Sequence, residues 1–182
     1  MLNRTAYDSG ADPRQEGPGT RLTAELAAVL SAARRRATRD GDRQVDTAHL
    51  LHGLLESDAA VRAMFDGAGP PVARLLGYLV QRSIGYGLRW HGRVEDSGTV
   101  PVVEGGAPGW SPAALAAVDG ARTLARARRA DHADCLDLLA ALLGDPESRA
   151  VEVLRRASVD TSLVAARLVG DAARRRGDAA AR

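Results

Sequence analysis

The sequence is a duplication that repeats itself at an offset of 88 residues. Slid by this offset, residues 22–55 lie on residues 110–143 without a gap, and the helix-start residue Thr23 falls on Ser111. The identical pairs are Ala28/Ala116, Ala33/Ala121, Arg34/Arg122, Ala37/Ala125, Asp46/Asp134, Leu50/Leu138, Leu51/Leu139, Leu54/Leu142 and Leu55/Leu143. Self-similarity at a fixed offset indicates copies of one supersecondary unit that pack together. We therefore expect two pseudo-symmetric halves.

Each copy has the apolar periodicity of four helices. The composition agrees, because a chain with 45% hydrophobic but only 3% aromatic residues packs its core from Leu, Val and Ala, which suits helices better than a β-sandwich. The predicted helices are Leu22 to Arg39 (N-cap Thr23), Val45 to Leu55 (N-cap Asp46 or Thr47), Ala59 to Asp66, Val72 to Val80, Pro112 to Ala125 (N-cap Ser111), Asp134 to Leu143, Pro146 to Ala157 and Asp160 to about Arg176. The fold class is all-α, with about eight helices.

Glycine and proline place the expected boundaries. We expect a disordered segment at 1–21, a first repeat at 22–82, a Gly-rich linker at 83–109, a second repeat at 110–170 and an Arg/Ala-rich tail at 171–182. Within the linker, 88–94 and 99–103 carry a weak hairpin signal. The aromatic residues Tyr78, Tyr86, Trp90 and Trp110 gather around it, either as packing against the repeats or as one wall of a peptide groove.

The absence of lysine excludes several activities. All 25 basic residues are arginine, so a Walker A loop, a Schiff base and a kinase phosphate clamp have no amine to use. No G-x-S-x-G elbow is present. We therefore expect no enzyme and no cofactor.

Cysteine count and hydropathy suggest the compartment. The single cysteine, Cys135, permits no internal disulfide, and no stretch reaches about 18 apolar residues. The first 20 residues contain no apolar signal region. We expect a cytoplasmic protein without a membrane partner.

Two groups of residues invite chemical interpretations. His49, His52 and Glu56 fall at i, i+3 and i+7 on one helix, but no fourth ligand is evident, so we predict no metal site. Cys135 follows Asp134 at a helix start, where the dipole would lower a thiol pKa; the alternative that we favour is a small buried apolar side chain.

The motif residues resemble the Clp repeat. The first copy has Leu22-Thr23, then Gly41, Val45 and the run Thr47-Ala48-His49-Leu50-Leu51-His52-Gly53-Leu54-Leu55, close to the family pattern G-x-x-x-[IV]-G-T-E-H-L-L-x-G-L. The second copy has Ser111-Pro112 and the run from Asp134 to Leu143. This resemblance implies a double Clp repeat, the N-terminal domain of the Hsp100 chaperones, which docks substrates and adaptors ahead of AAA+ ATPase rings. The rings are absent here, so the chain resembles a stand-alone N-domain.

By the same resemblance, the contact positions lie at the helix starts of both copies. They are Thr23, Thr47, Ala48 and His49 in the first copy, and Ser111, Cys135 and Leu136 in the second. In some family members the glutamate of each T-E-H-L-L motif lies in a site that receives phosphorylated arginine or peptide groups. Ala48 and Leu136 stand at those positions, so phosphoarginine recognition is in doubt. Cys135 and Asp137 replace the family Thr and His in the second copy, so the two sites are not equivalent.

The resemblance leads to a hypothesis of function. We expect a non-catalytic module that binds protein or peptide ligands as an adaptor, competitor or decoy in Clp-dependent proteolysis; a cyclic peptide is a candidate small ligand. The alternative is a nucleic-acid-associated regulator that uses the arginines around 34–36, 126–129 and 174–176. Nucleic acid is the less favoured partner, because the formal net charge is only +2 and aromatic residues do not accompany these arginines.

Overall fold

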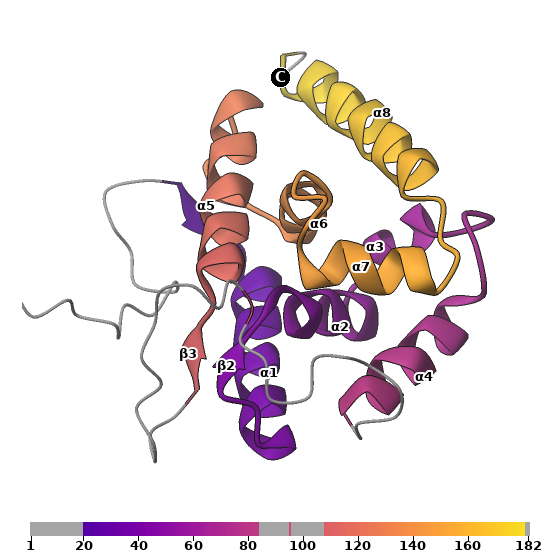
Figure 1. Cartoon of the computed structure of the whole chain (residues 1–182). Helices are drawn as coiled ribbons and strands as arrows, with labels where there is room; N and C mark the ends of the chain where they lie inside the picture. Colours follow the sequence, from indigo (N-terminus) through magenta and orange to yellow (C-terminus); the bar gives the residue numbers. More distant parts are fainter. Residues whose placement is uncertain (1–19, 84–94, 96–107, 181–182) are drawn as a thin grey trace, which may run out of the picture.

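The computed structural model describes residues 20–83, 95 and 108–180 and confirms the all-α fold (Figure 1). Its first half contains β1 (Arg21–Leu22), α1 (Ala24–Asp40), β2 (Gln44–Val45), α2 (Thr47–Ser57), α3 (Ala59–Met64) and α4 (Val72–Ser83). Its second half contains β3 (Gly109–Trp110), α5 (Pro112–Ala127), β4 (His132–Ala133), α6 (Cys135–Leu143), α7 (Arg149–Arg156) and α8 (Thr161–Ala180). The described residues therefore form eight helices, four in each half.

The helix starts confirm the duplication. Ala24 of α1 and Pro112 of α5 lie 88 positions apart, as do Thr47 of α2 and Cys135 of α6. The N-caps agree with the sequence: the Thr23 side chain accepts a hydrogen bond from the backbone N–H of Leu26, and Ser111 caps α5 ahead of a proline in its first turn. Local capping chemistry thus places the same helices at the same register in both halves.

Two pairs of very short parallel strands link the halves. Strand β1 pairs with β4, and β2 pairs with β3, so the strand that opens each half joins the strand between the first two helices of the other half. The sequence analysis did not predict these strands. Each has only two residues, too few to leave an alternating pattern. Their consequence is that the start of α5 is held beside the start of α2.

Helices α2 and α6 form the centre of the molecule. Every residue of α2 from Thr47 to Leu55 is buried, because α2 packs against α1, α4 and α7 and also contacts α6. Gly53 allows a close crossing with α1, since a Cβ there would lie 3.1 Å from Val29 Cγ1 and that side chain would have to move. In the second half the small residue is Gly120 on α5, where a Cβ would lie 3.0 Å from Ala141 Cβ on α6. Each half thus has one glycine where its first two helices approach closely.

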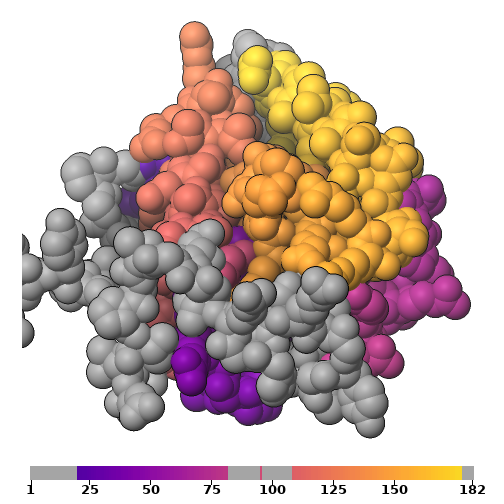
Figure 2. Space-filling model, in the orientation of Figure 1, coloured from indigo at the N-terminus to yellow at the C-terminus, as the bar shows by residue number. Residues whose placement is uncertain are grey.

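Some helix boundaries differ from the predicted ones. Helix α8 continues to Ala180, through most of the segment expected to be a tail, and α7 begins at Arg149 instead of Pro146. Helices α5 to α8 form much of the face seen in Figure 2. The expected hairpin at 88–94 and 99–103, and Tyr86 and Trp90, lie outside the described residues. None of the helices in the described part of the chain is both long and apolar enough to cross a bilayer.

Candidate functional site

The candidate site lies where three helices begin. Asp46 caps α2, Ser148 caps α7 and Ser111 caps α5, and the β2–β3 pair holds Ser111 near α2 through the hydrogen bond from its N–H to the Val45 carbonyl (2.9 Å). The first backbone N–H groups of a helix have no partner within it. The N–H of Thr47 and that of Arg149 are the first of α2 and α7. Donors from both halves therefore converge at one place.

The carboxylate of Glu95 occupies this place. Its Oε2 accepts hydrogen bonds from the Thr47 N–H (3.0 Å) and from Ser111 Oγ (2.7 Å). Its Oε1 accepts from Thr47 Oγ1 (2.5 Å) and from the Arg149 N–H (2.9 Å). Gln44 Nε2 donates to the Glu95 backbone carbonyl (3.1 Å). Glu95 is only 6% exposed, so four protein donors replace the water that a buried carboxylate loses.

The donors to Glu95 are themselves held in place by other contacts. Thr47 Oγ1 already accepts a hydrogen bond from the Ala150 N–H (3.0 Å), and Ser111 Oγ accepts from the Ala114 N–H (3.0 Å). Both hydroxyl groups therefore direct their own hydrogen towards Glu95, and the two backbone N–H groups can only donate. The helix N-termini add partial positive charge beside the carboxylate.

A buried ion pair lies beside this carboxylate. Asp46 is 1% exposed, and its Oδ2 lies 2.7 Å from Arg149 Nη1. Its Oδ1 accepts from the His49 N–H (3.0 Å), and the His49 ring completes a capping box with the Asp46 backbone. Thr47 and Asp46 thus use their side chains to tie α2 to α7. The polar residues at the start of α2 hold the two halves together.

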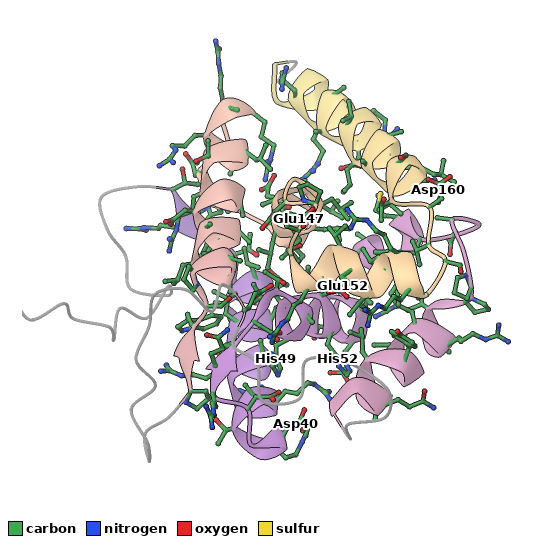
Figure 3. The ribbon with its side chains drawn as sticks, viewed as in Figure 1. Asp40, His49, His52, Glu147, Glu152 and Asp160 are labelled. Atoms are coloured by element: carbon green, nitrogen blue, oxygen red, sulfur yellow. The ribbon has the colours of Figure 1, made fainter. Side chains whose placement is uncertain are left out.

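The side chains of His49, His52 and Glu56, which share one helix, do not bring their potential ligand atoms to a common point. His52 Nε2 lies 3.3 Å from Glu56 Oε1, whereas His49 Nε2 lies 2.9 Å from Asp42 Oδ2 (Figure 3). Within the described residues, the one group whose potential donor atoms lie within 4.8 Å of one another is Asp40, Asp42 and His49. Asp42 is exposed, and its hydrogen bond with His49 accounts for their proximity. That no metal binds stays a prediction.

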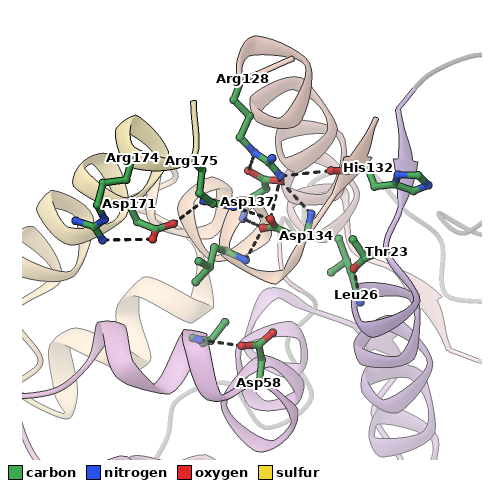
Figure 4. A network of polar contacts seen from close by, with 12 residues as sticks. Thr23, Leu26, Asp58, Arg128, His132, Asp134, Asp137, Asp171, Arg174 and Arg175 are labelled. Carbon is green, nitrogen blue, oxygen red and sulfur yellow. Dashed lines mark hydrogen bonds and ion pairs between the residues drawn. The ribbon is translucent and has the colours of Figure 1, made fainter. Parts of the chain in front are cut away.

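The equivalent place in the other copy has different chemistry (Figure 4). Cys135 takes the position of Thr47, and Thr23 takes that of Ser111. The N-cap of α3 is Asp58, whose carboxylate accepts a hydrogen bond from the Val61 N–H (3.0 Å) and lies close enough to Cys135 to raise the pKa of its thiol. A carboxylate is therefore built into the helix cap at this second place, and no carboxylate from outside is needed.

Burial reverses the pKa shift expected for Cys135. A position in the first turn of α6 would lower the pKa of the thiol. Burial instead raises its pKa far above the ordinary value, and the neighbouring Asp58 carboxylate raises it further. The side chain is only 2% exposed. Cys135 is therefore a neutral, buried thiol, as the favoured interpretation of the sequence had it.

Arginine residues close the outer side of the second copy. Arg128 Nη2 lies 2.6 Å from Asp137 Oδ2 and 2.9 Å from Asp134 Oδ2, and Arg175 Nη1 also reaches Asp134 Oδ2 (2.6 Å). Asp171 pairs in turn with Arg175 (2.6 Å). The hydrogen bond with Asp137 raises the pKa of Arg128. This network joins α8 to the start of α6. It also pairs Arg128 and Arg175, which the sequence analysis considered for phosphate binding, with carboxylates of this chain.

The predicted contact residues are mostly interior. Thr47, Ala48, His49, Ser111 and Cys135 are buried, while Thr23 and Leu136 are partly exposed. The structure brings Thr47 and Ser111 together on one carboxylate and places Cys135 at the equivalent position in the other copy. Glu95 was missed by sequence reasoning. It is 48 residues from Thr47 and 16 from Ser111, and no local pattern marks it.

The duplicated four-helix units with exchanged strand pairs define an all-α double-repeat domain. No protein-family model and no curated relative matches the sequence. Solved structures do match. The N-terminal domain of the caseinolytic protease associated chaperone ClpD from Arabidopsis thaliana is 16% identical, with a TM-score of 0.62, over 86% of this chain and 97% of that chain.

Two further structures match over a similar extent. The Hsp104 N-terminal domain from Candida albicans is 12% identical, with a TM-score of 0.62, over 81% of this chain and 89% of that chain. A structure from a malarial protein secretion system is 16% identical, with a TM-score of 0.59, over 83% and 94%. The chain therefore has the fold of the Clp N-terminal domain, as the sequence resemblance predicted.

Proposed function

We propose that this chain is a non-catalytic module that binds protein or peptide ligands and acts as an adaptor, competitor or decoy in Clp-dependent proteolysis. The observation that carries the proposal is the Clp N-terminal fold, which extends over more than 80% of the chain in each comparison. Thr23 and Leu136 are the predicted contact residues that a ligand can reach directly, because they are partly exposed. A cyclic peptide remains a candidate ligand of the same kind.

The ion pairs favour this proposal over binding to nucleic acid. Each arginine run has members paired with carboxylates: Arg36 with Glu56 (2.7 Å), Arg128 with Asp137 and Arg175 with Asp171. A guanidinium group that is already neutralised gains less from a phosphate. We expect little DNA binding at physiological salt, which a salt titration of a fluorescent duplex would measure.

Degradation of a fluorescent client by a purified Clp chaperone–protease tests the proposal. An excess of this chain should slow degradation if it competes for clients, or accelerate it if it delivers them. The variant Leu136→Asp should lose the effect, because it puts a charge on a partly exposed contact position. Val169→Asp is the matched control, since Val169 is 71% exposed on α8. An unchanged degradation rate over a wide excess of the chain would refute the proposal.

A further inference from the structure

Four hydrogen-bond donors form a cradle whose shape does not depend on Glu95. Two of them, the Thr47 and Arg149 N–H groups, are fixed by the starts of α2 and α7. The other two are hydroxyl groups whose oxygens are already held by backbone donors, the Ala150 N–H on Thr47 and the Ala114 N–H on Ser111. If Glu95 leaves, all four donors keep their positions and lose their acceptor. A preorganised set of this kind binds an anion at little cost in ordering.

The geometry suits a carboxylate in particular. Each oxygen of Glu95 accepts one backbone N–H and one hydroxyl, at distances of 2.5–3.0 Å. The four donors therefore form two pairs, which match two acceptor atoms of one planar group. Asp46 lies next to the cradle but is neutralised by Arg149 at 2.7 Å, so it does not repel a second carboxylate strongly.

The equivalent place in the other copy cannot do the same. Cys135 offers a weak thiol donor where Thr47 has a hydroxyl, and Asp58 already lies near that thiol. The Asp58 carboxylate would also repel an incoming anion. Of the two equivalent places in the described part of the chain, only one is therefore a cradle, and it is formed at the boundary between the halves.

We propose that this cradle is a carboxylate-binding site and that Glu95 is its intramolecular ligand, which an acidic side chain of a partner protein must displace in order to bind. Glu95 lies between the two repeats in the sequence and belongs to no described helix or strand. It is thus a tethered competitor, present at an effective concentration in the millimolar range or above. Glu95 thus keeps weak anions out of the site, and an acidic group enters only when the rest of a partner adds affinity.

Removal of the tethered carboxylate tests the proposal on the isolated chain, with acetate as the probe. In Glu95→Ala, acetate titrated against chloride at constant ionic strength should shift the Thr47 and Arg149 amide signals in 15N NMR spectra. The shifts should saturate, with an affinity at least about tenfold higher than in the wild-type chain. The matched variant Glu95→Ala/Thr47→Val removes one donor and should lose most of this binding.

Several results would overturn the proposal. They are shifts that do not saturate, equal acetate affinity with and without Glu95, or tighter binding of inorganic phosphate than of acetate. Glu95→Gln is the second variant in case Glu95→Ala does not fold, and unfolding of both would show that Glu95 is a structural tie and not a displaceable ligand. No Clp component takes part in the experiment, so its outcome is independent of the proposed function.

Discussion

Thr47→Val isolates the energetic role of the hydroxyl group that joins the halves. Thr47 Oγ1 donates to Glu95 and accepts from the Ala150 N–H, and both contacts are buried. A lost hydrogen bond to a charged group costs about 1.5–3 kcal/mol, and an unpaired buried N–H costs about 1–3 kcal/mol. The new methyl group recovers about 0.8 kcal/mol by burial. We expect a loss of about 2–5 kcal/mol in the free energy of unfolding.

Urea denaturation followed by far-UV circular dichroism measures this loss. Thr38→Val is the matched control, because Thr38 Oγ1 donates only to the Arg34 carbonyl on an exposed helix face, and its effect should stay within about 0.5 kcal/mol. A double-mutant cycle with Glu95→Gln should give a coupling of about 1 kcal/mol or more, since the two side chains touch. A cost of Thr47→Val no larger than that of the control, or no coupling to Glu95, would refute the reasoning.

Three further predictions concern the core, the thiol and a buried histidine. Leu139→Ala should cost about 2–5 kcal/mol in urea denaturation, because Leu139 is fully buried, whereas Val169→Ala at an exposed position should cost less than about 0.5 kcal/mol. Burial raises the pKa of Cys135, so iodoacetamide at pH 8 should react slowly until urea unfolds the chain; rapid reaction in the native state would contradict the buried thiol. Burial lowers the pKa of His52 from 6.5 to about 4, with the Arg36 charge adding to the effect. Neutral His52 therefore supports folding above pH 6.5, and this support, at most about 3 kcal/mol, is lost as the pH falls towards 4. His52→Gln should lose less stability than wild type between pH 7 and 4, and His132→Gln, at an exposed position, should behave like wild type.

Helices were predictable wherever the signal was local. Thr23, Ser111 and Asp134 each act as the N-cap that their sequence context indicated. The leucines of α2 are buried as their spacing required, whereas in the second copy Leu138, Leu139 and Leu142 are buried and Leu124 on α5 is 40% exposed. On α4 the stripe is less complete than its spacing suggested, since Val80 is 41% exposed. Periodicity identifies one face of a helix, but it does not tell how much of that face a neighbour will cover.

The site was only partly predictable, because its contacts join distant residues. The resemblance selected Thr47 and Ser111, whose hydroxyl groups do face one carboxylate. Nothing near Glu95 in the sequence distinguishes it from the other acidic residues, and its partners lie on three elements from both halves. Cys135 is a second example of a property set by distant residues. Its position at a helix start predicts a lowered thiol pKa, whereas burial and Asp58, 77 positions earlier in the sequence, raise that pKa.

In both copies a carboxylate lies next to a pair of helix N-termini, but it comes from a different part of the chain in each copy. Two helix starts from different halves meet at each place, α2 with α7 and α6 with α3. Their N-terminal amides concentrate partial positive charge. At one place Asp58, a cap within the helix pair itself, supplies the negative charge, so that place is complete once the halves pack. At the other, Ser148 caps α7 with a neutral side chain and the Asp46 cap of α2 is paired with Arg149, so a further negative charge comes from outside the helices. Glu95 supplies it from the segment between the repeats, and a carboxylate held in this way is the one that another protein can replace without undoing a helix cap.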